Sequence, residues 1–149
     1  MPKKSTSNLE YELKRSESIH DYLQTNKEEL ASDSLPSLLQ TLMTGKNLTK
    51  AEVVRESNMN EIYAYQILSG VRRPSRDKLL CICLAMKASL EETQDVLKRS
   101  GFAPLYARNQ RDSIIMYGLT HEQTILQLNS NLFDNGEEVL EYLRLIPFL

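Results

Sequence analysis

The stretch TKAEVVRESNMNEIYAYQILSGVRRP, residues 49–74, decides the fold of this chain. It opens with a capping box, in which the Thr49 hydroxyl and the Glu52 carboxylate each satisfy a backbone N–H at the start of a helix. Asn58 tolerates the left-handed backbone of a turn, and Asn60 is suited to cap the helix that follows it. The pattern therefore predicts two short helices joined by a tight turn.

The second of these helices is expected to span Glu61 to Ser69 and to end at Gly70, since glycine is the usual residue just past a helix and a proline follows at position 74. Arg72 and Arg73 stand between the two. They are either ordinary basic residues near the negative end of a helix dipole, or side chains that bind a negatively charged partner.

The rest of the chain also has helix patterns, and no stretch alternates like a strand, which predicts an all-α fold of roughly eight helices. Residues 1–8 are polar and expected to be loose. Capping boxes are expected at residues 89–92 and 120–123, an N-cap at Asp33 or Ser34 and another at Ser75. The further helices are expected at residues 9–30 (as one helix or two), 35–45, 76–87, 90–100, 124–133 and 137–145.

Composition bounds the class of protein. The chain has 149 residues, 41% of them hydrophobic and 26% charged, which is typical of a globular domain with an extension. No apolar run approaches the roughly 20 residues of a membrane span, and no apolar run follows the N-terminal lysines, so we expect a cytoplasmic protein without membrane contact. Cys81 and Cys83 are expected to be small buried residues in a reducing compartment.

No catalytic, cofactor or metal motif is found. The two cysteines are two positions apart on a predicted helix, and His20 and His121 are the only histidines, so no metal site is expected. No nucleophile has a base at a recognisable spacing and there is no glycine-rich phosphate loop. We therefore expect neither an enzyme nor a bound cofactor.

Charge is distributed unevenly along the chain although the net charge is only −2. Residues 46–80 carry seven Lys or Arg against four Asp or Glu, whereas residues 119–149 carry one against five. The basic excess coincides with the two helices described first, which weakly favours an anionic partner for that segment.

Residues 48–74 resemble the lambda-repressor-like helix-turn-helix family, of the Cro or xenobiotic-response-element type. The motif is carried by Leu48-Thr49, Val54, the turn at Asn58, Met59 and Asn60, the core positions Ala64 and Ile67, and the ending Gly70, basic residues and Pro74. With the apolar run LLCICLAM and the start SLEET, the resemblance extends over about residues 35–99. It implies a five-helix DNA-binding domain at 34–100, preceded by a polar tail and amphipathic helix (1–33) and followed by a C-terminal helical extension packed on it (101–149).

The sequence departs from the family pattern at a few positions. Val54 and Ala64 exchange the usual small and large residues where the helices cross, so that volume is conserved. Asn58 replaces a glycine, and Lys50 replaces a glutamine that usually braces a phosphate.

The resemblance implies a transcriptional regulator from a bacterium or phage that reads the major groove of double-stranded DNA with helix 61–69. Glu61, Ile62 and Gln66 are the expected base contacts, with Gln66 suited to adenine. The expected phosphate contacts are Lys50, Tyr65, Arg72 and Arg73. A homodimer is expected, because family members commonly bind two half-sites about one DNA turn apart.

Two other functions remain open. The chain can be an adaptor that kept the fold but binds a protein, through Tyr63 and Tyr65 or through the acidic C-terminal helices. It can also be a sensor that binds a small molecule with its C-terminal helices, although the sequence has no ligand-binding motif that supports this function. The salt dependence of binding would separate DNA from a protein partner.

Overall fold

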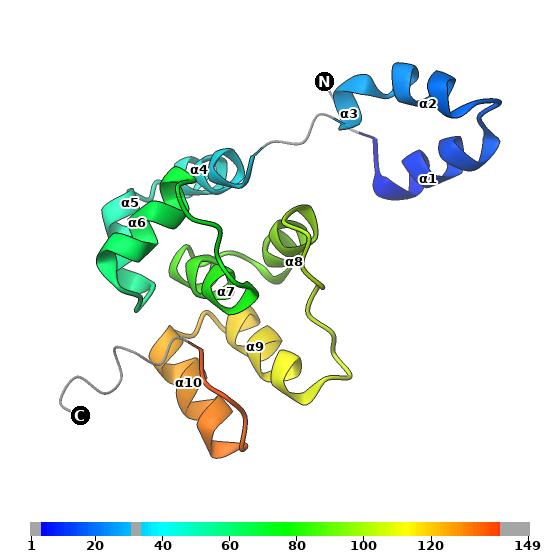
Figure 1. Ribbon diagram of the computed structural model, residues 1–149. Helices are drawn as coiled ribbons and strands as arrows, with labels where there is room; N and C mark the ends of the chain where they lie inside the picture. Colours follow the sequence, from blue (N-terminus) through cyan, green and yellow to red (C-terminus); the bar gives the residue numbers. More distant parts are fainter. Residues whose placement is uncertain (1–3, 31–33, 141–149) are drawn as a thin grey trace. The chain divides into compact units, whose positions relative to one another are not determined.

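The computed structural model describes residues 4–30 and 34–140, and every regular element in these two ranges is an α-helix (Figure 1). The predicted all-α class is therefore confirmed. The described ranges contain ten helices rather than about eight, and none of these helices has the length and apolar character needed to cross a bilayer. The chain divides into two compact units, the second of which begins at Ser34.

The first unit contains three short helices: α1 (Thr6–Arg15), α2 (Ile19–Thr25) and α3 (Lys27–Leu30). The prediction of one or two helices over 9–30 is thus wrong, because the chain leaves the helix twice: at Ser16, which is extended before the Ser18 cap, and at Asn26, with φ of −108°. Residues 6–8, expected to be loose, are helical because the Ser5 side chain accepts a hydrogen bond from a backbone N–H of the first turn. Tyr22 is the one buried apolar side chain among residues 4–30.

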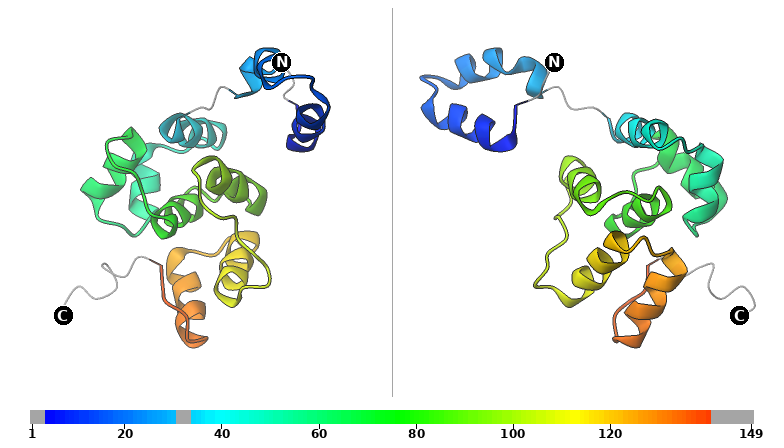
Figure 2. Two further views of the ribbon diagram at one scale, coloured as in Figure 1. Left: turned by 45° about the vertical axis from the view of Figure 1, so that its right-hand side comes forward. Right: turned by 180° about the vertical axis from the view of Figure 1, so that it is seen from behind.

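The second unit is built around α7 (Figures 1 and 2). Helix α7 contacts α5 on one side and α10 on another, and also packs on α8. All seven residues from Leu79 to Ala85 are buried, so α7 is apolar around its whole circumference. The helices of this unit are α4 (Leu35–Gly45), α5 (Lys50–Glu56), α6 (Glu61–Ser69), α7 (Arg76–Ala85), α8 (Leu90–Arg99), α9 (Gln110–Thr120) and α10 (Ile125–Asp134).

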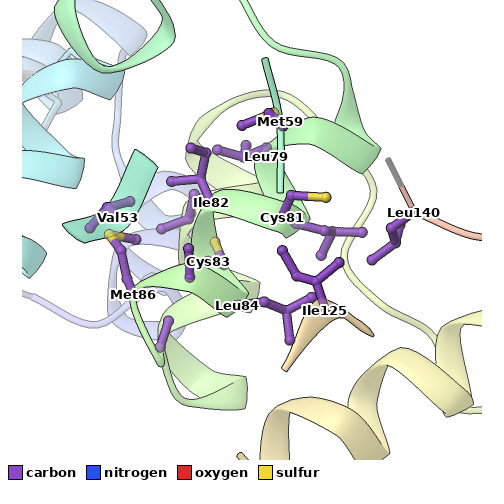
Figure 3. Packing of buried hydrophobic residues seen from close by; sticks show 14 of the residues in the cluster. Val53, Met59, Leu79, Cys81, Ile82, Cys83, Leu84, Met86, Ile125 and Leu140 are labelled. Carbon is purple, nitrogen blue, oxygen red and sulfur yellow. The ribbon is translucent and has the colours of Figure 1, made fainter. Parts of the chain in front are cut away.

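Burial of α7 on all sides explains the two cysteines. Cys81 and Cys83 are not joined in a disulfide and are fully buried, as predicted. They lie on different faces of the helix, but each face is covered. Side chains from α5 (Val53), from α10 (Ile125) and from the segment after α10 (Leu140) surround α7 (Figure 3).

The predicted capping box at residues 120–123 is wrong. Thr120 is the last residue of α9, and the box is formed four residues later, by Thr124 and Gln127. Gly118 lies inside α9 and packs against α10, where an added Cβ would lie 2.8 Å from Leu128 Cδ1. The chain then turns at Glu122, whose φ is 51°.

The helix expected at residues 35–45 is present as α4, which ends at Gly45 as predicted, and the left-handed residue that follows is Asn47, with φ of 57°. The helix expected at 137–145 is absent from its described part, residues 137–140, and its remainder lies outside the described residues. Instead, the buried amide of Asn129 donates to the Leu140 carbonyl (2.6 Å) and accepts from its N–H (2.7 Å).

Two reciprocal ion pairs join α9 to the start of α7. Arg76 of α7 binds Asp112 of α9 through two hydrogen bonds of 3.2 Å. Arg111 of α9 binds Asp77 of α7 through two hydrogen bonds of 3.0 Å, which raise the pKa of Arg111. Each helix thus contributes one arginine and one aspartate, adjacent in sequence, to the two ion pairs. These contacts add to the apolar core that the helices share.

Candidate functional site

Helices α5 and α6 are joined by the turn at residues 57–60, and each predicted cap is present. Thr49 and Glu52 form the capping box that starts α5. Asn58 has a φ of 61°, and the Asn60 side chain accepts a hydrogen bond of 3.1 Å from the backbone N–H of Tyr63. The turn is therefore set by local side-chain chemistry, as the sequence predicts.

The inner and outer faces of α6 differ sharply. Ala64, Ile67 and Leu68 are buried in the core of the second unit, and Val54 of α5 is buried with them. The outer face consists of exposed residues, namely Glu61, Ile62 (71% exposed) and Tyr65. The buried face thus fixes the rotation of α6 about its own axis, and in this orientation Glu61 and Ile62 are exposed to solvent.

Gly70 turns the chain back along α6. Its φ is 85°, and the backbone N–H groups of Val71 and Arg72 both donate to the Gln66 carbonyl. Any side chain here would be strained by the backbone and would bring its Cβ within 2.8 Å of Pro36 Cγ. This sharp reversal places the Arg72 side chain beside the end of α6.

Arg72, Gln66 and Tyr63 form a cluster. Arg72 Nε donates to Gln66 Oε1 at 3.0 Å, and the guanidinium carbon lies 4.7 Å from the centre of the Tyr63 ring. Lys78 Nζ lies 4.9 Å from the same ring centre. Tyr63 is half-buried, so its ring positions two cations beside α6 rather than offering a bare aromatic surface.

The Arg73 side chain contacts other residues than the Arg72 side chain does. Its Nη2 donates to the backbone carbonyl of Ser100, at 3.0 Å, and its guanidinium lies 5.9 Å from the Phe102 ring centre. It therefore ties the loop after α6 to the end of α8. Sequence reasoning missed this contact because 27 residues separate the partners.

Two further predicted contacts lie on α5 and α6. Lys50 is exposed at the first position of α5, and Tyr65 is 38% exposed on α6. Lys78 was not anticipated, although its place in the first turn after the Ser75 cap is a signal that sequence could have supplied. The structure thus pairs Gln66 with Arg72, whereas Arg73 has a different hydrogen-bond partner, the Ser100 carbonyl.

No group of three His, Cys, Asp or Glu residues within the described ranges is arranged to hold a metal ion. Comparison with protein-family models, with curated proteins and with solved structures found no match to this chain. Function is therefore inferred from the site itself.

Proposed function

We propose that the chain is a sequence-specific, repressor-like regulator that binds double-stranded DNA through a lambda-repressor-like helix-turn-helix domain. The observation that carries this proposal is the α5–turn–α6 unit, with its outer face exposed and Arg72 folded back beside that face. The five helices α4 to α8, between Leu35 and Arg99, agree in number with such a domain. A second helix held by its inner face and exposed on its outer face is the arrangement that lets a helix enter the major groove.

In the proposed complex, the start of α6 faces base edges through Glu61 and Ile62, and Gln66 contacts a base one turn further on. A carboxylate can accept from cytosine N4, and an isoleucine can contact a thymine methyl group. The side chains of all three residues lie on α6, whose rotation is fixed by the buried face.

Phosphate contacts are proposed for Lys50, Tyr65, Arg72 and Arg73, on either side of α6. Arg72 is exposed and positioned by the Tyr63 ring. Arg73 gives one N–H to Ser100, and a guanidinium has five N–H groups, so donors remain for a phosphate.

We propose that the protein acts as a homodimer in the cytoplasm of a bacterium or a phage-infected cell. Leu126 and Phe133 support self-association, because they lie seven positions apart on α10 and are 65% and 75% exposed. Two protomers would present two α6 helices to half-sites about one helical turn apart.

The experiment that tests this function is selection of the purified protein on random double-stranded DNA, with Gln66→Ala in parallel. Arg55→Gln serves as a matched control, since Arg55 is an exposed basic residue of α5 outside the proposed contacts. An enriched sequence that loses one position in Gln66→Ala alone is the expected result. No enrichment by the wild-type protein would contradict the proposal.

A second candidate function is a protein-binding adaptor. The observation that favours it is the exposure of Ile62 (71%) and Val71 (75%) near the two ends of α6, since exposed apolar residues are common at protein interfaces. Tyr63 is a weaker candidate than expected for such a surface because Arg72 and Lys78 lie over its ring. Binding that barely changes between 50 and about 200 mM salt would favour the adaptor over DNA.

A further inference from the structure

A pocket of about 270 Å³ lies where the start of α4, the end of α6 and the end of α8 meet. Three arginines line it, Arg72, Arg73 and Arg99, and none of the lining residues that the structure describes is acidic. Apolar side chains form the remainder of the wall, among them Pro36, Ile67 and Phe102. The pocket thus combines a concentrated positive charge with an apolar surface.

The three arginines keep most of their hydrogen-bonding capacity. Among the described residues, each makes one side-chain hydrogen bond: Arg72 to Gln66, Arg73 to the Ser100 carbonyl, and Arg99 to Asp95. A guanidinium has five N–H groups. An anion in the pocket would therefore meet unused donors and would relieve the repulsion between like charges.

The size and the apolar wall restrict what such an anion can be. A pocket of 270 Å³ is slightly smaller than the roughly 300–1,000 Å³ of sites for drug-sized molecules. Bare phosphate would leave the apolar wall uncovered. A compact molecule with one ring and one anionic group would use both parts of the pocket.

We propose that this pocket binds a small organic anion with an apolar ring, of the aryl phosphate or aryl carboxylate class. Binding of this kind goes beyond the proposed DNA reading and does not depend on it. Its consequence does rest on the proposed function: Arg72 and Arg73 belong both to the pocket and to the proposed phosphate contacts, so an occupied pocket would compete with DNA.

The test uses phenyl phosphate as probe and the full chain, with binding measured by isothermal titration calorimetry. Arg99→Gln is the informative variant because Arg99 lines the pocket but has no proposed DNA contact. Arg55→Gln removes an exposed arginine from α5, away from the pocket, and is the matched control. Circular dichroism melting of each variant checks that the fold is retained.

We expect phenyl phosphate to bind the wild type and the control equally, to bind Arg99→Gln about fivefold more weakly, and to bind more tightly than inorganic phosphate. Absence of binding at millimolar concentration, or equal weakening in both variants, would overturn the site. Equal affinity for inorganic phosphate would overturn the apolar part of the proposal. All these readouts are independent of DNA, so a failure of the DNA-binding function would be seen separately.

Discussion

Arg72 and Gln66 form one hydrogen-bonded pair, in which Arg72 Nε donates to Gln66 Oε1 at 3.0 Å. A glutamine reads adenine by accepting a hydrogen bond at Oε1 and donating one from Nε2. In the pair, Arg72 takes one of the two lone pairs of Oε1, and its remaining N–H groups add donors beside Gln66 Nε2. Guanine offers two acceptors in the major groove, so under the proposed function we expect the pair to favour guanine rather than the adenine expected for Gln66 alone.

This pairing predicts how two substitutions differ. Gln66→Ala should remove the preference at one base pair, at a cost of about 1–3 kcal/mol. Arg72→Ala should remove the added donors, leave both lone pairs of Oε1 open to a base and shift the preference at the same position from guanine toward adenine. Competition binding with DNA duplexes that differ at that base pair measures both effects, and an adenine preference in the wild type would contradict the pairing argument.

The two neighbouring arginines should also differ in their effect on stability. Arg72→Gln should lower the slope of log affinity against log salt by about 1 with little loss of stability. Arg73→Gln should lower the slope and also destabilise the fold by roughly 1 kcal/mol, because the hydrogen bond to Ser100 is lost. Fluorescence anisotropy at several salt concentrations and urea denaturation separate the two effects. Equal stabilities of the two variants would argue against the tie to α8.

The reciprocal ion pairs between α7 and α9 should contribute unequally. Asp112→Ala should cost about 2–3 kcal/mol, because Asp112 is buried and its loss leaves Arg76 without its carboxylate. Asp77→Ala should cost about 1 kcal/mol or less, since the Asp77 side chain is 41% exposed. Urea denaturation measures both, and a larger loss for Asp77→Ala would contradict the burial argument.

Cys83 provides a pH-dependent prediction. Burial raises the pKa of its thiol from 9.0 to about 12. Because the folded-state pKa lies above the unfolded one, this thiol supports the fold fully below about pH 9, and its contribution is lost progressively as pH rises from about 9 to 12. Cys83→Ala should therefore lose less stability than the wild type between pH 8 and about 10.5, as measured by urea denaturation.

The same burial predicts the reactivity of the thiols. Both cysteines are fully buried, so at pH 8 the native protein should react with a thiol reagent only as fast as it unfolds, whereas in urea both thiols should react at once. Rapid labelling of the native protein would mean that α7 is more accessible than the structure indicates.

Local chemistry made several elements predictable from sequence. The boxes at Thr49 and Ser89, the turn at Asn58 and the helix end at Gly70 were all predicted correctly, because each depends on hydrogen bonds within a few residues. The same reasoning failed at Thr120, where two successive Thr-x-x-Gln patterns satisfy the capping rule equally well. Only the second of them forms the box in the structure, where α9 extends to Thr120 and its Gly118 packs on α10.

In the candidate site, too, local features were predictable from sequence and long-range contacts were not. Sequence reasoning identified the residues on the outer face of α6 and the basic pair after it, since helical spacing and the glycine stop are local signals. It could not predict that Arg72 hydrogen-bonds to Gln66 and Arg73 to the Ser100 carbonyl. The direction of each side chain depends on which residues lie beside the loop once it has reversed.

By itself, then, the amino-acid sequence determined that this protein is helical, where most of its helices start, and which two short helices are joined by a tight turn. Only the tertiary structure decided that α7 is surrounded on all sides, that two ion pairs join α9 to it, and that three arginines line one pocket. The physical reason is range: a cap is satisfied by neighbours in the chain, whereas burial and charge pairing depend on residues brought together by packing.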